Sequence, residues 1–86
     1  MASSSQTSVT STSVLVIESY GENRDVHLRN VGSHTMYLGG PNVTTSNGFA
    51  LPKDAYINFR VAPKSVIWAV CSNNETGTAS VLYMEP

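Results

Sequence analysis

The chain has 86 residues, with five basic and six acidic side chains, a net charge of −1, and only 13% charged residues. This balance argues against a nucleic-acid-binding protein, which would present a basic face. The single cysteine excludes an internal disulfide, and His27 and His34 have no neighbours at zinc-ligand spacing, so no metal or other cofactor is predicted. A chain of this length forms one domain that buries roughly 63% of its unfolded surface. We therefore expect it to gain stability by self-association or by docking on a partner.

The polarity of the chain comes mainly from Ser, Thr and Asn. Such a surface suits contact with another protein, because few ions must lose their water. The alternative is a small β-rich protein with no special surface. No apolar run approaches the ~20 residues of a membrane span, and the N-terminus lacks the features of a secretory signal. We expect a soluble protein that is made in a cytoplasm.

Residues 1–13 are rich in Ser and Thr and have little to bury, which predicts a flexible N-terminal arm beside a single all-β domain at 14–86. Thr and Val pair well in strands, so the arm could add as a strand to a neighbouring chain; an inert disordered terminus is the alternative. Deletion of residues 1–12 is then expected to spare the fold and weaken attachment. The candidate contact residues of the arm are Ser3, Gln6, Thr7 and Val9.

The first half of the domain predicts three strands. Residues 13–19 are mostly apolar, which indicates a buried strand. Residues 26–31 alternate between apolar and polar side chains, and residues 35–38 form the next strand. A tight connection at Gly32-Ser33 predicts that the last two strands pair as a hairpin.

The second half continues the β pattern. Residues 39–42 are turn formers, Phe49 and Leu51 are predicted to enter the core, and residues 55–61 show the cleanest alternation in the chain. Residues 65–71 predict a second central strand, and residues 78–84 close the fold. Six or seven short strands without helical periodicity predict an all-β protein, either a small antiparallel β-sandwich or a partly open β-barrel.

No residue set has the pattern of a catalytic site. No Ser/His/Asp or Cys/His arrangement and no pair of carboxylates has supporting spacing, so we predict that the chain is not an enzyme. Cys71 ends an apolar strand and is predicted to be a buried small hydrophobe. Trp68 is predicted to pack in the core, whereas Tyr37 and Tyr56 lie on the polar faces of their strands and are candidate contact residues for a protein or a sugar.

The stretch from Val26 to Glu85 resembles a group of small β proteins encoded by tailed bacteriophages. The shared pattern is an Asn-x-Gly-Ser/Thr turn, a Tyr-Leu-Gly-Gly turn, a Val-Thr-x-x-x-Gly segment and a final Thr-x-x-Val-Leu strand. The chain departs from the pattern at Pro52-Lys53, where these proteins often have Pro-Gly. The matching positions are Asn30, Gly32, Ser33, Tyr37, Leu38, Gly39, Gly40, Val43, Thr44, Gly48, Leu51, Thr78, Val81 and Leu82.

The resemblance implies a non-enzymatic virion structural protein, most simply a capsid decoration protein that binds and stabilises the outside of the assembled head. Its partners would be the major capsid protein and further copies of itself, with a trimer favoured, and neither nucleic acid nor membrane. It would be made in the host bacterial cytoplasm and reside on the head surface of the virion. The alternative implied by the same resemblance is a head-fibre or tail module with a receptor- or glycan-binding face.

Overall fold

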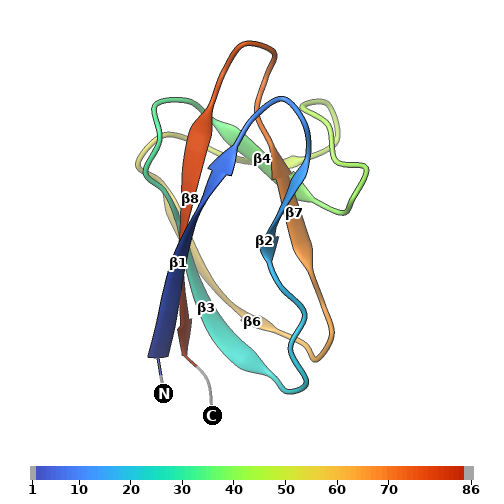
Figure 1. Cartoon of the computed structure of the whole chain (residues 1–86), viewed down its shortest axis with the longest axis vertical. Coiled ribbons are helices and arrows are strands. Elements are labelled where there is room, and N and C mark those ends of the chain that lie inside the picture. The colour runs from blue at the N-terminus through green and yellow to red at the C-terminus, as the bar shows by residue number, and fades with distance from the viewer. Residues whose placement is uncertain (1, 85–86) are drawn as a thin grey trace.

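The computed structural model describes residues 2–84, which form two packed four-stranded antiparallel sheets and no helix (Figure 1). The predicted all-β class is confirmed, as a small β-sandwich 38 Å long. Because these residues contain no helix, none is long and apolar enough to cross a membrane. The strands are β1 (Ala2–Val9), β2 (Val14–Ile17), β3 (Arg24–Asn30), β4 (Met36–Gly39), β5 (Phe49–Leu51), β6 (Tyr56–Val61), β7 (Ile67–Val70) and β8 (Gly77–Met84).

Sheet A has the strand order β1-β8-β3-β6, and sheet B has the order β2-β7-β4-β5. The predicted hairpin across Gly32-Ser33 is wrong, since β3 pairs with β6 and β8 whereas β4 pairs with β5 and β7. The connection crosses from one sheet to the other. It passes close to the start of β8, where a Cβ on Gly32 would lie 2.5 Å from the Cα of Gly77. Only glycine allows this close backbone approach.

The core lies between the sheets and follows the alternation of the strands. On β3, Val26 and Leu28 are fully buried while their neighbours are exposed. Met36 and Leu38 of β4 point into the same core from sheet B. The remaining core members are Val9, Val16, Ile17, Leu51, Val61, Ala69, Cys71, Ala79, Val81 and Tyr83. The strands of both sheets are therefore held by one shared apolar layer.

The N-terminal segment belongs to the sandwich, so the prediction of an arm outside the domain is wrong for residues 2–9. They form β1, which pairs with β8 in eight register pairs from Ala2↔Met84 to Val9↔Gly77. Val9 is fully buried, and the N–H of Cys71 donates to the carbonyl of Thr10 at 2.7 Å. The segment was expected to add as a strand to a neighbouring chain, but it adds to β8 of its own chain. This happens because β8 offers an edge for pairing and Val9 completes the core. Met1 lies outside the described residues.

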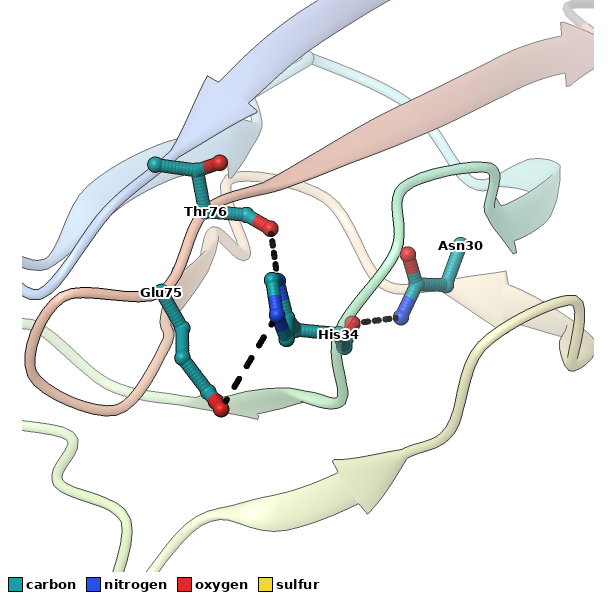
Figure 2. A network of polar contacts seen from close by, with 4 residues as sticks. All are labelled: Asn30, His34, Glu75 and Thr76. Carbon is teal, nitrogen blue, oxygen red and sulfur yellow. Dashed lines mark hydrogen bonds and ion pairs between the residues drawn. The ribbon is translucent and has the colours of Figure 1, made fainter.

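Asn30 joins the two sheets at one end of the molecule. Its side chain is fully buried, and its Nδ2 donates to the carbonyls of His34 (2.8 Å) and Leu51 (2.9 Å). Its Oδ1 accepts from the N–H of Gly32 at 3.0 Å. The ring of His34 turns to the other side, where Nδ1 lies 3.0 Å from the carbonyl oxygen of Thr76 (Figure 2). One asparagine thus satisfies polar groups of the crossing connection and of β5.

Candidate functional site

The candidate site is the outer face of sheet A. Every second side chain of its strands points to this face, and these side chains are polar or large and apolar. On β3 the residues that point away from the core are Asp25, His27 and Arg29. The register of β6 places Arg60, Asn58 and Tyr56 directly opposite them. β8 adds a second set of neighbours on the other side of β3. The face is therefore continuous across all four strands.

The cross-strand register arranges this face in three rows. The first row is Gln6, Ser80, Arg29 and Tyr56. The second row is Ser4, Leu82, His27 and Asn58. The third row contains Met84, Asp25 and Arg60. Neighbouring strands lie about 4.8 Å apart, so each complete row spans roughly 14–15 Å across the sheet.

Apolar side chains are unusually prominent on this polar face. Tyr56 is 68% exposed, Met84 46% and Leu82 39%. A shallow hollow of about 270 Å³ lies among Tyr56, Arg29, His27, Asn58, Ser80 and Leu82. Tyrosine is enriched among the residues that dominate binding energy, since it combines a large apolar ring with a polar tip. Tyr56 is the strongest candidate anchor for a partner.

Two polar pairs hold side chains in place beside the hollow. Nδ1 of His27 lies 2.6 Å from Oδ1 of Asn58, and Nε of Arg60 lies 3.2 Å from Oδ1 of Asp25. The Arg60–Asp25 pair is well exposed and contributes little to stability, but it neutralises two of the three full charges on this part of the face. Arg29 has no carboxylate partner among residues 2–84. The face therefore carries a small positive excess on a chain of net charge −1.

The structure brings two of the predicted contact residues together. Gln6 and Tyr56 lie in the first row of the outer face of sheet A, although 50 positions separate them in the chain. Ser3 and Thr7 occupy the alternate positions of β1, on the side that faces sheet B. Val9 is wrong as a contact residue, because it is fully buried as part of the core.

Tyr37 lies on the other sheet and does not join this site. It points to the outer side of sheet B, where the loop 40–48 covers part of it. Val43 of the loop is buried against the sheet. Gly48 lies so close to β4 that a Cβ at this position would be 2.6 Å from the Cβ of Tyr37. The two tyrosines therefore occupy opposite outer faces and cannot act as one aromatic platform.

The remaining chemically active groups are engaged in structural contacts. His34 contacts the Thr76 carbonyl, with Oε2 of Glu75 4.0 Å from its Nε2. Cys71 is 2% exposed, which confirms the predicted buried thiol. Burial raises the pKa of the Cys71 thiol, and the nearby charge of Glu75 adds to the effect. The thiol is therefore protonated and unreactive at neutral pH.

Sequence reasoning missed most members of the site. The missed residues include Arg29, Leu82 and Met84, which lie at outward positions of correctly predicted strands. The alternation of those strands already indicated that these side chains point outward. What the pattern lacked was strand order: nothing in the sequence indicated that β3 lies between β6 and β8. The chain matches no protein-family model and no curated protein. The arrangement of the outer face of sheet A is therefore the main observation on function.

Proposed function

We propose that this chain is a non-enzymatic virion structural protein of a tailed bacteriophage. In this proposal it decorates the outside of the assembled capsid and binds the major capsid protein through the outer face of sheet A. We choose this surface because the strand register places Tyr56, Leu82 and Met84 on one lightly charged face. The phage origin is supported by the sequence pattern from Asn30 to Leu82.

The composition of the face suits attachment to a protein surface. Three exposed apolar side chains supply area to bury, and Asp25 and Arg60 already form an ion pair, so neither charge would be buried without a partner. Arg29 adds a positive group that a carboxylate on the capsid could meet. Binding would rest on these three apolar side chains, and the charges would orient the approach.

The size of the face sets a limit on the affinity of one copy. Four strands about 4.8 Å apart and about 20 Å long give a projected face of roughly 400 Å². A stable protein interface buries about 800 Å² on each partner. One copy is therefore expected to bind weakly, and stabilisation of the head would come from many copies, each adding to the cost of separating neighbouring capsid subunits.

Co-sedimentation with undecorated, expanded heads tests the proposal, with the stoichiometry measured in the pellet. We expect saturable binding at a ratio that matches symmetry axes of the capsid lattice. Tyr56→Ala is expected to weaken binding about tenfold or more, which corresponds to ~1.4 kcal/mol or more. Tyr37→Ala is the matched control, because it removes the same side chain from the opposite outer face. Absence of binding at any concentration would contradict a decoration role.

The hollow beside Tyr56 favours a second candidate, a head-fibre or tail module that binds a glycan or a receptor. Its lining joins an aromatic ring to amide, imidazole and guanidinium groups, which can stack on a sugar ring and bind its hydroxyls. A glycan-array signal that Tyr56→Ala abolishes and Tyr37→Ala preserves would favour this function. Saturable binding of the wild-type chain to empty heads, with no glycan signal, would favour decoration.

A further inference from the structure

The free edge of β6 has its backbone groups directed at solvent in a defined pattern. The N–H of Asn30 donates to the carbonyl of Ala55, next to the register pair Arg29↔Tyr56. In an antiparallel ladder this bond makes Arg29↔Tyr56 a non-hydrogen-bonded pair, and the alternation continues along β6. Ile57, Phe59 and Val61 therefore bond to β3. The N–H and C=O groups of Tyr56, Asn58 and Arg60 point away from it.

An apolar groove runs beside this free edge. It has a volume of about 530 Å³ and lies between β6 of sheet A and strands β4, β5 and β7 of sheet B. Ile57 and Phe59 form one wall, and Leu38, Phe49, Val66 and Ile67 contribute to the remainder. Phe49 is 61% exposed and Val66 40% exposed at its margin. A strand added to β6 would therefore gain hydrogen bonds and bury apolar side chains together.

The other edges of the two sheets lack this combination. β1 presents Ser3, Ser5 and Thr7 on its inward side, so a strand added there would bury little apolar surface. β5 has only three residues, and the register of β2 shifts between Leu15 and Ile17. Short or irregular edges are ways in which β proteins avoid edge pairing. β6 is the regular, six-residue edge with an apolar inner side.

We propose that β6 pairs antiparallel with β6 of a second copy of this chain, about a two-fold axis at Asn58. The choice of a second copy follows from self-complementarity. With Asn58 opposite Asn58, each Tyr56 faces Arg60 of the other copy, so no like charges meet and each guanidinium lies beside an aromatic ring. On the inner side each Ile57 faces Phe59 of the other copy, and the two apolar grooves become continuous.

The dimer does not rest on the proposed function, but it has a consequence for it. The two-fold axis of an antiparallel edge pair stands perpendicular to the sheet, so both outer faces of sheet A lie on the same side. The joined face is about twice the roughly 400 Å² of one copy and approaches the area of a stable interface. The resemblance to phage proteins favours a trimer, whereas this edge produces a dimer, so the mass in solution distinguishes them.

Light scattering coupled to size exclusion, from about 1 to 100 µM, measures the mass of the full chain. We expect a dimer that dissociates on dilution. Asn58→Pro removes an N–H that points to the free edge and is not used by β3, so it is expected to abolish dimerisation and leave the circular dichroism spectrum unchanged. Asn58→Ala is the matched control, since it also loses the contact with His27 but keeps the N–H, and it is expected to stay dimeric.

A disulfide test reports the register directly and needs no proline. In the proposed pair the two copies of position 58 have Cα atoms about 5.5 Å apart, within the range of a disulfide. Asn58→Cys is expected to form a covalent dimer under mild oxidation. Arg60→Cys alone is not, because its symmetry mates lie four residues out of register, roughly 13–14 Å apart. A mixture of Arg60→Cys and Tyr56→Cys chains is expected to cross-link. Buried Cys71 serves as the internal control, because the wild type must stay uncross-linked.

Three results would overturn the proposal. One is a monomer at all concentrations, and another is a trimer. The third is a dimer in which Asn58→Cys does not cross-link, since that dimer uses another face. None of these results bears on the proposed function, and failure of the wild type to bind heads leaves the dimer standing.

Discussion

Replacement of Asn30 by alanine is expected to remove a large part of the stability of this fold. The substitution leaves the buried Leu51 carbonyl without its partner, at a cost of about 1–3 kcal/mol. The His34 carbonyl and the Gly32 N–H are only partly buried, so each loses about 1 kcal/mol. The sum is roughly 3–5 kcal/mol. A domain of 86 residues has a total stability of about 4–13 kcal/mol, at ~0.05–0.15 kcal/mol per residue.

Urea denaturation followed by circular dichroism measures this loss. With a slope of about 1 kcal/mol/M for a domain of this size, the midpoint of Asn30→Ala is expected to fall by about 3 M or more. Asn30→Asp should be at least as harmful at neutral pH, because its carboxylate cannot donate to the two carbonyls. Asn58→Ala is the matched control at an exposed position and should change stability by less than ~0.5 kcal/mol. A loss below about 1 kcal/mol in Asn30→Ala would refute the reasoning.

Three further predictions concern packing and the thiol. Gly32→Ala forces a Cβ within 2.5 Å of the Gly77 Cα and should cost more than ~2 kcal/mol in urea denaturation, whereas Gly21→Ala, with nothing within 4 Å, should be neutral. Val9→Ala opens a cavity in the core and should lower the unfolding free energy by about 1–3 kcal/mol, against no change if β1 is a free arm. Folding raises the pKa of the Cys71 thiol, so the contribution of this group to stability is complete below about pH 8.5, the usual pKa of an unfolded thiol. The contribution is lost as the pH rises through the folded pKa, and Cys71→Ala should remove this loss of stability at high pH.

Local sequence patterns predicted the strands more reliably than their partners. The alternation of residues 55–61 matches β6 within one residue at the start, and the apolar run before Cys71 contains β7. The hairpin prediction failed because Gly32-Ser33 has the composition of a tight turn, while its role is to pass beside Gly77 on the way to the other sheet. The structural role of Asn30 was not predicted, since an asparagine before a turn is ordinarily a surface residue and only the fold buries it.

The candidate site was predicted only in part. Tyr56 was identified from its place on the polar face of a strand, which period-two alternation decides locally. Val9 was assigned to an arm because the Ser/Thr-rich segment before it has no apolar pattern of its own. Val9 is buried because β1 pairs with the edge of β8 and so reaches the shared core. The residues next to Val9 in the sequence cannot form that core by themselves.

The sequence by itself determined the all-β class, the low charge and the inward or outward direction of most side chains, because these properties depend on composition and on neighbours one or two residues away. Tertiary structure alone decided that β1 completes sheet A, that Gln6 and Tyr56 share a row, and that β6 is left as an open edge beside an apolar groove. The physical reason is that strand pairing joins segments far apart in the chain. Alternation of residues is compatible with many strand orders, and only the packing of one shared core selects among them.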